Sequence, residues 1–173
     1  KGLEEVAREL GKDPSEMVKL ASNENPHGPA PKAVEAIKEG APSVHHYPKS
    51  GHTDLTAALA EKWSVEPSQI WLSPGGDGAL DYLARAMLEP GDGVLVPSPG
   101  FAYYEMSARF HHGAVKTYDV RDELDAFRAD TVLERYDGER IVYLTSPHNP
   151  TGSRYDLESI GRIASETDEE TLV

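Results

Sequence analysis

The 173-residue sequence contains no cysteine, which excludes disulfide bonds and thiolate metal sites. It contains no run of about 18 apolar residues, so we expect no membrane-spanning helix. The chain starts Lys1-Gly2-Leu3, with neither an initiator methionine nor the apolar stretch of a signal peptide. These absences predict a cytoplasmic protein.

Basic residues are scarce: the sequence contains 17 basic and 30 acidic residues, and its net charge is −13. Nucleic acids and anionic membranes require basic patches, so we expect neither as a partner. A small anionic ligand is not excluded, because one local site can override the mean field. Such acidity is favoured in a high-salt cytoplasm, but many enzymes from ordinary habitats are also acidic, and both explanations stay open here.

The chain alternates between helical and strand-like patterns. Helices are predicted over residues 3–10, 31–40, 53–63, 77–88, 101–112 and 122–136, with a last helix containing Leu157, Ile160 and Ile163. Extended or strand segments are predicted over residues 18–22, 69–73, 94–96, 114–120 and 141–145. This alternation predicts an α/β fold with a largely parallel sheet flanked by helices. Residues 169–173 look like the start of a further strand, so we expect the chain to be the amino-terminal piece of a longer protein.

The segment Arg140-Ile-Val-Tyr-Leu-Thr-Ser-Pro-His-Asn-Pro-Thr-Gly152 carries the clearest functional pattern. A β-branched apolar run ends in a loop with two prolines and a glycine. Pro147 and Pro150 restrict the backbone on both sides of Asn149. The carboxamide of Asn149 can then be held in one direction, where it both donates and accepts hydrogen bonds. On these residues alone, a simple turn explains the pattern equally well.

Two further loops combine strand ends with ligand-binding features. Ser73-Pro-Gly-Gly-Asp-Gly78 joins a predicted strand to a predicted helix, and the free amides of a helix start bind anions. A tight turn capped by Asp77 is the alternative. In Pro97-Ser-Pro-Gly-Phe-Ala-Tyr-Tyr104, Phe101 can stack on a heteroaromatic ring, or Phe101 and Tyr104 can be core residues at helical spacing.

Together these motifs resemble those of pyridoxal-phosphate aminotransferases with the aspartate-aminotransferase fold. The resemblance implies that Asn149 binds the 3-hydroxyl of the cofactor, that Gly76 and Asp77 bind its phosphate, and that Phe101 stacks on its ring. Tyr104 is a weaker candidate for contacting the substrate. Gly78 departs from the acidic residue that is more usual at its position.

The amino-terminal segment Leu20-Ala-Ser-Asn-Glu-Asn-Pro-His-Gly28, followed by Tyr47-Pro48, resembles the histidinol-phosphate branch of the same family. This resemblance implies a homodimer in which Tyr47 reaches the partner subunit's site, near the cofactor phosphate. Asn25 is a weak candidate for lining the substrate entrance. The implied reaction exchanges an amino group between L-histidinol phosphate and 2-oxoglutarate in histidine biosynthesis.

The resemblance also implies that the catalytic residues lie in a part of the full-length protein that this sequence does not include. The lysine that forms a Schiff base with the cofactor, its aspartate partner and the substrate-binding arginine are expected beyond Val173, so no residue here is predicted to be catalytic. Residues 1–50 would be an amino-terminal arm and the start of a small domain. Residues 51–173 would be the truncated amino-terminal part of the cofactor-binding large domain.

Three alternatives remain on the sequence. An aromatic aminotransferase or a threonine-phosphate decarboxylase would share the cofactor residues. A non-catalytic phosphate-binding α/β domain would use the glycine turn alone.

No metal site is predicted, because the adjacent pairs His45-His46 and His111-His112 point in divergent directions on regular elements.

Overall fold

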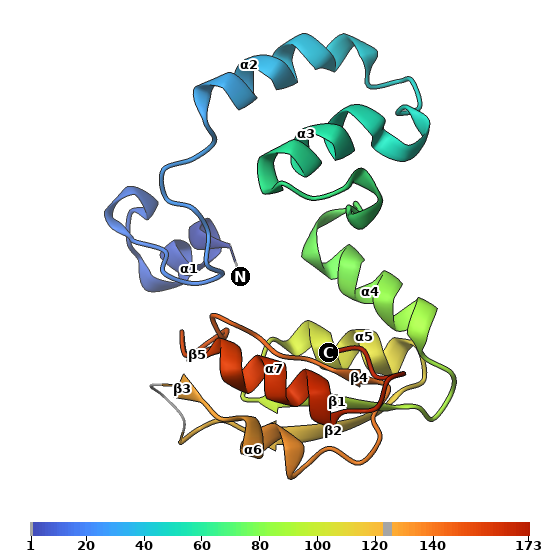
Figure 1. Ribbon diagram of the computed structural model, residues 1–173. Coiled ribbons are helices and arrows are strands. Elements are labelled where there is room, and N and C mark those ends of the chain that lie inside the picture. Colours follow the sequence, from blue (N-terminus) through green and yellow to red (C-terminus); the bar gives the residue numbers. More distant parts are fainter. Residues whose placement is uncertain (1, 123–125) are drawn as a thin grey trace. The chain divides into compact units, whose positions relative to one another are not determined.

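The computed structural model describes residues 2–122 and 126–173. The chain divides into two compact units, Lys1–Gly51 and His52–Val173, and each is described by itself (Figure 1). No helix within the described residues is both long enough and apolar enough to cross a membrane.

The first unit is built from helices with little core. Its elements are α1 (Leu3–Leu10), η1 (Pro14–Glu16), α2 (Pro31–Gly40), η2 (Ala41–Ser43) and the start of η3 (Ser50–His52). Both α-helices match their predicted ranges. Gly11 ends α1 in the left-handed region, at φ 61°, which glycine adopts without steric cost. Pro31 is the first residue of α2, where its missing amide hydrogen costs nothing. Residues 18–22, expected to be extended, form no strand, and Ser22 has a positive φ of 72°.

The second unit contains the parallel sheet. Its helices are α3 (Thr53–Trp63), η4 (Pro67–Gln69), α4 (Gly75–Met87), α5 (Ala102–Phe110), α6 (Ala129–Leu133) and α7 (Leu157–Glu166). Its strands are β1 (Gly93–Ser98), β2 (Ala114–Asp119), β3 (Ala126–Phe127), β4 (Ile141–Val142) and β5 (Arg154–Tyr155).

Strand β1 is the centre of a three-stranded sheet in the order β2-β1-β4. Both pairings are parallel, with Val94 opposite Val115 on one side and Ile141 on the other. Ile141 also forms a parallel bridge to Leu172, so the chain's last residues begin to extend this sheet as expected. A second parallel pair joins β3 to β5. The predicted α/β fold with a parallel sheet is confirmed.

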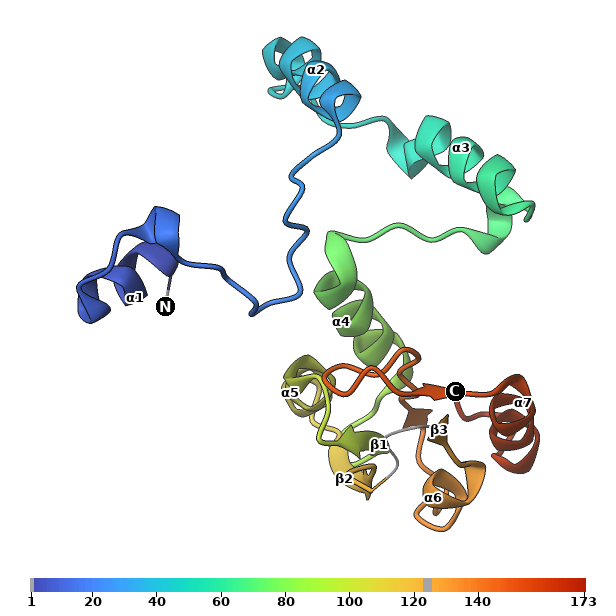
Figure 2. The ribbon, with the colours of Figure 1, turned by 90° about the vertical axis from the view of Figure 1, so that its left-hand side faces the viewer.

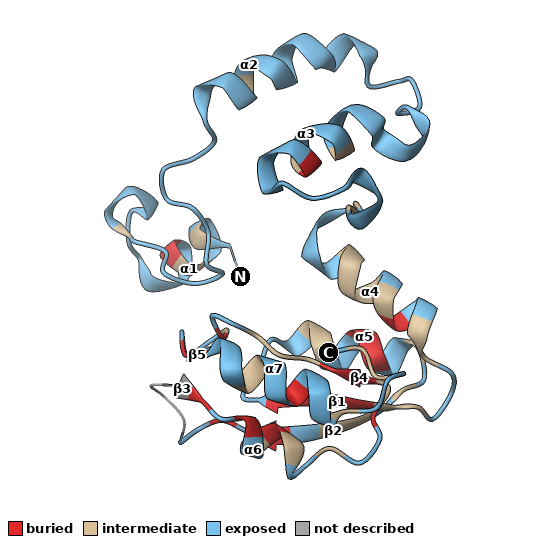
Figure 3. Ribbon diagram, viewed as in Figure 1, coloured by how far each residue is buried: buried red, intermediate tan, exposed pale blue. Residues whose placement is uncertain are grey.

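Helices cover both faces of the sheet because successive residues of β1 point to opposite sides. Val94 and Val96 pack with Ala108 of α5. Leu95, between them, packs with Val132 of α6 and Ile163 of α7, in agreement with the helices on either side of the sheet (Figures 1 and 2). The buried residues concentrate in these layers (Figure 3).

Several predicted elements differ from those of the structure. Residues 70–72 form no strand, since the sheet of the described residues places no strand beside them and strands are stable only when paired. The segment 122–136 is not mostly helical: β3 and the five-residue helix α6 occupy its described part, while residues 123–125 lie outside the described residues. Helix α4 starts at Gly75 instead of residue 77, and β4 ends at Val142.

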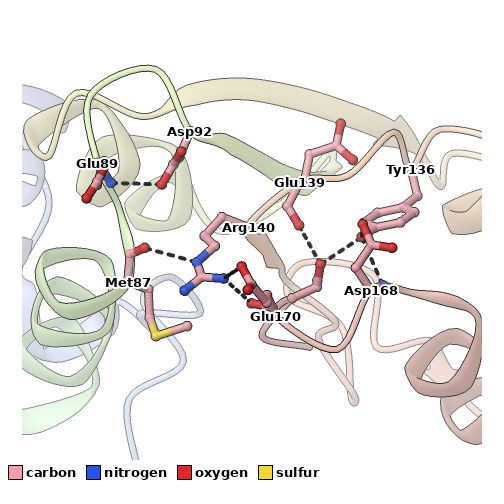
Figure 4. Close-up of polar contacts among 9 residues, drawn as sticks. Met87, Glu89, Asp92, Tyr136, Glu139, Arg140, Asp168 and Glu170 are labelled. Carbon is pink, nitrogen blue, oxygen red and sulfur yellow. Dashed lines mark hydrogen bonds and ion pairs between the residues drawn. The ribbon is translucent and has the colours of Figure 1, made fainter.

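Arg140, the residue before β4, ties α4 to the segment after α7 (Figure 4). Its Nε donates to the carbonyl of Met87 at 3.3 Å, and its Nη1 donates to the carbonyl of Glu170 at 2.7 Å and to its carboxylate at 3.0 Å. The Arg140 amide donates to Gly93 O at 2.8 Å, and its carbonyl accepts from Leu172 N at 3.0 Å. The side chain and the backbone of Arg140 therefore both hold the chain after α7 against the region where α4 ends and β1 begins.

Candidate functional site

Two of the three predicted ligand loops leave the sheet at one edge. Strand β1 leads into the loop that carries Phe101, and β4 leads into the loop that carries Asn149. Because β1 and β4 are parallel neighbours, their carboxyl ends lie at the same edge of the sheet. This edge is where open α/β sheets bind ligands.

Phe101 is the N-cap residue of α5, and 37% of it is exposed, so part of its ring is free to meet a ligand. The turn before it is tight. A Cβ atom on Gly100 would lie 2.4 Å from the carbonyl oxygen of Pro97, so only glycine fits there. The ring of Phe101 meets that of Tyr104 edge-on, with centroids 5.6 Å apart and an interplanar angle of 83°.

The loop around Asn149 is folded on itself. The amide of His148 donates to Ser153 O at 2.6 Å, and the amide of Gly152 donates back to His148 O at 2.7 Å. The peptide bonds before Pro147 and Pro150 are cis. Asn149 itself is half-buried. The hydrogen bonds of His148 with Ser153 and Gly152 close the backbone into a compact turn, and the direction of the Asn149 carboxamide stays a prediction.

His148 anchors this loop, and sequence reasoning missed it because the histidines were weighed only as adjacent pairs. Its side chain is 3% exposed and meets the ring of Phe127 edge-on at 5.0 Å. Its Nδ1 lies 2.9 Å from Thr151 Oγ1. Burial lowers the pKa of His148, an effect that the nearby Pro99 carbonyl partly offsets. The imidazole of His148 therefore fills the core beside Phe127, where burial disfavours its charged form.

Tyr104 connects the two loops. Its ring stacks on Tyr143 with centroids 4.7 Å apart and an interplanar angle of 17°. Its hydroxyl accepts a hydrogen bond from Thr145 Oγ1 at 3.0 Å. Tyr143 and Thr145 belong to the segment that runs from β4 toward Asn149. Sequence analysis had proposed Tyr104 as a weak substrate contact, and this remains a prediction.

Gly76 and Asp77 lie in the first turn of α4, which has no side-chain cap. A Cβ atom on Gly75 or Gly76 would meet nothing within 4 Å, so the backbone there is open to an approaching group. The amides of a helix's first turn lack intrahelical partners, and the helix dipole adds positive potential. Packing explains why residue 78 is glycine. A Cβ atom there would lie 2.9 Å from Pro74 Cδ, which leaves no room for the acidic side chain that is more usual at this position.

Helix α4 is joined to α5, the helix that Phe101 begins. Ser107 Oγ donates to the carbonyl of Leu80 at 3.2 Å, and His111 Nε2 lies 2.8 Å from the carboxylate of Asp81. The elements that carry the glycine turn, the aromatic ring and the asparagine are therefore linked by contacts. The convergence of these three groups on one cofactor stays a prediction.

Tyr47 and Asn25 belong to the other unit. Tyr47 is fully exposed. Asn25 uses its carboxamide inside its own turn, where Oδ1 accepts from the amide of His27 at 3.0 Å and Nδ2 donates to the carbonyl of Gly28 at 3.1 Å. The roles that the sequence predicts for Tyr47 and Asn25 remain predictions.

The last lysine of the sequence is engaged elsewhere. Lys116 Nζ lies 3.0 Å from Glu139 Oε1. The Glu139 side chain is 5% exposed and is followed by β4, so this ion pair lies toward the amino ends of the strands, away from the loops of Phe101 and Asn149.

The model of the family of class I and II aminotransferases matches residues 15–173, and the chain belongs to this family. Among curated relatives, a histidinol-phosphate aminotransferase of Halobacterium salinarum is 66% identical over 175 residues, which cover all of this chain and 48% of the relative. A protein of the same name from Haloarcula marismortui is 65% identical, with the same shares covered. The chain spans about half the length of the curated relatives it matches.

Solved structures agree with the family. Histidinol-phosphate aminotransferase from Sinorhizobium meliloti, in complex with pyridoxal 5'-phosphate, superposes with a TM-score of 0.84 at 29% identity, over 99% of this chain and 46% of that one. Aspartate aminotransferase from Thermus thermophilus with maleate gives a TM-score of 0.78 at 28% identity, over 96% and 47% of the two chains. The predicted membership of the aspartate-aminotransferase fold family is confirmed.

Proposed function

We propose that the chain is the amino-terminal part of a cytoplasmic, homodimeric, pyridoxal-phosphate-dependent aminotransferase. The full-length protein exchanges an amino group between L-histidinol phosphate and 2-oxoglutarate in histidine biosynthesis. The observation that carries this proposal is the 66% identity, over the whole chain, to a relative of that name.

The residues present fit the proposed cofactor. The open, uncapped start of α4 at Gly76 and Asp77 offers amide donors to the phosphate. The partly exposed ring of Phe101 offers a stacking surface to the pyridine ring, and the carboxamide of Asn149 suits the 3-hydroxyl. Tyr47 of the partner subunit completes the phosphate site. When bound, pyridoxal phosphate supplies the electron sink that stabilises negative charge at the substrate's α-carbon.

Proton transfer is assigned to a residue outside this chain. Lys116 is bound to the buried Glu139, so it is not free to reach the cofactor. The lysine that holds the cofactor, the aspartate that pairs with the pyridine nitrogen and the arginine that binds the substrate carboxylate belong to the remaining half of the protein. What this chain supplies is binding and orientation.

The test compares the full-length protein with the 173-residue chain. Each is incubated with pyridoxal phosphate, L-histidinol phosphate and 2-oxoglutarate, and glutamate is measured. We expect glutamate from the full-length protein and none above the blank from the chain. Glutamate production by the chain alone would contradict the assignment of the lysine to the other half.

An assay with a second amino donor distinguishes the proposed function from that of an aromatic aminotransferase. An aromatic amino acid replaces L-histidinol phosphate in the same assay. Faster transamination of the aromatic donor would favour an aromatic aminotransferase. Release of CO2 from a phosphorylated amino acid would favour a decarboxylase of the same fold. A protein that binds phosphate but no pyridoxal phosphate would be the non-catalytic domain.

A further inference from the structure

Three side chains meet around Tyr104 of α5. Phe101 lies edge-on to Tyr104, Tyr143 stacks on it, and Thr145 Oγ1 donates to its hydroxyl at 3.0 Å. Phe101 follows β1, whereas Tyr143 and Thr145 follow β4. We name these four residues the Tyr104 cluster. Tyr104 is thus in contact both with the proposed stacking residue and with the segment that leads to Asn149.

The Tyr143 side of the cluster is anchored in the sheet. The amide of Tyr143 donates to Leu95 O at 2.9 Å, and its carbonyl accepts from Tyr118 Oη at 2.7 Å. The Tyr143 hydroxyl is buried with no hydrogen-bond partner among the described residues, and burial, reinforced by Tyr104, raises its pKa to about 12. Stacking and backbone bonds therefore hold this ring in place, and its hydroxyl does not.

The far end of the Asn149 loop returns to the same place. Tyr155, which follows the loop, donates from its hydroxyl to Tyr118 Oη at 3.1 Å. Its amide donates to Ser146 Oγ at 3.3 Å. The loop is therefore tied at its start through Thr145 and at its end through Tyr155.

We infer that Tyr104 is a positioning residue, which, through its hydrogen bond with Thr145 and its ring contacts, sets the placement of Phe101 relative to Asn149. The inference rests on the proposed function, because it assigns the pair to one cofactor. Tyr104 acts through its neighbours: its hydroxyl oxygen accepts from Thr145 Oγ1, and its ring contacts both Phe101 and Tyr143. A direct substrate contact, in contrast, would need that hydroxyl to face the substrate.

The test is a double-mutant cycle in the full-length protein, with Tyr104→Phe, Thr145→Val and both together. Each change removes one side of the hydrogen bond and preserves the side-chain shape. Tyr103→Phe is the matched control, since it removes a hydroxyl one residue away while its ring remains near Phe101, 6.5 Å between centroids. The dissociation constant of pyridoxal phosphate and the circular dichroism of the bound cofactor are measured without substrate.

We expect either single variant to weaken cofactor binding about fivefold and to alter the cofactor's dichroism. The double variant should lose no more than either single one, because both remove the same interaction. The control should stay within about twofold. Thr145→Val leaves every ring of the cluster intact, so it carries the test if Tyr104→Phe does not fold.

Other outcomes overturn the inference. Unchanged cofactor affinity with lowered thermal stability would show a structural role only. Unchanged affinity with a raised KM for the amino donor would restore the substrate role. Additive losses in the double variant would show that the two hydroxyls act separately. A wild-type protein that binds no pyridoxal phosphate would instead refute the proposed function.

Discussion

The two units of this chain form helices equally well but differ in what holds them. Among the described residues of Lys1–Gly51, Ala7 is the only buried one, while Val18 and Leu20 are 82% and 88% exposed. In His52–Val173, β1 alone buries Val94, Leu95 and Val96. The helices of the first unit therefore have little buried surface of their own, whereas the second unit is stabilised by burial on both faces of a sheet.

The units also differ in charge. Lys1–Gly51 contains 8 of the 30 acidic and 7 of the 17 basic residues, which leaves 22 acidic and 10 basic residues in His52–Val173. Nearly all of the net charge of −13 therefore belongs to the unit with the sheet. Its packing must offset the mutual repulsion of these charges.

The largest expected effect contrasts one leucine from each unit. Leu95→Ala removes a fully buried side chain at the centre of the sheet, and should cost about 3 kcal/mol in the free energy of unfolding. Leu20→Ala changes an exposed position and should cost less than about 0.5 kcal/mol. Urea unfolding of the chain measures both. Equal losses would show that the first unit has a core of its own.

A smaller effect is expected at the junction shown in Figure 4. Arg140→Met should cost about 2 kcal/mol, because it leaves the carbonyls of Met87 and Glu170 without their donor. Arg162→Met is the control, since its ion pairs with Asp130 and Glu166 lie on the surface, where such pairs contribute little. Thermal unfolding compares the two. An equal loss from Arg162→Met would contradict the role given to Arg140.

Salt tests the charge contrast. Molar KCl screens repulsion between surface carboxylates, so it should raise the unfolding midpoint of the full-length protein by about 2 °C, since about 1 kcal/mol shifts the midpoint of a domain of about 150–250 residues by roughly 2–4 °C and of a larger protein by less. Equal stability and activity with and without added salt would refute adaptation to a high-salt cytoplasm.

The smallest effect is a pH dependence at His148. Burial places its folded-state pKa below that of the unfolded chain, about 6.5. The unfolded chain then takes up the proton first, so stability should fall as the pH drops below about 6.5. His148→Gln should flatten this part of the profile, and His46→Gln, at an exposed position of the other unit, should not. Identical profiles for wild type and His148→Gln would exclude this contribution.

Local features were predictable where short-range chemistry decides them. The start of α2 at Pro31 and the end of α1 at Gly11 follow from backbone preferences alone, and so does the turn at Gly100. The site motifs were readable as well, since Phe101 and Asn149 each follow an apolar strand. His148 and Thr145 were missed because their roles depend on contacts with Phe127 and Tyr104, which sequence spacing does not contain.

By itself, the sequence determined the family, the parallel α/β class and the loops that carry the candidate ligand residues, because periodicity, turn residues and local motifs are written along the chain. Only the tertiary structure decided which strand patterns became strands. Residues 70–72 have strand-like composition and form none, while β1 is paired on both sides. A strand needs a neighbour to bond its backbone groups, and that neighbour is a property of the fold.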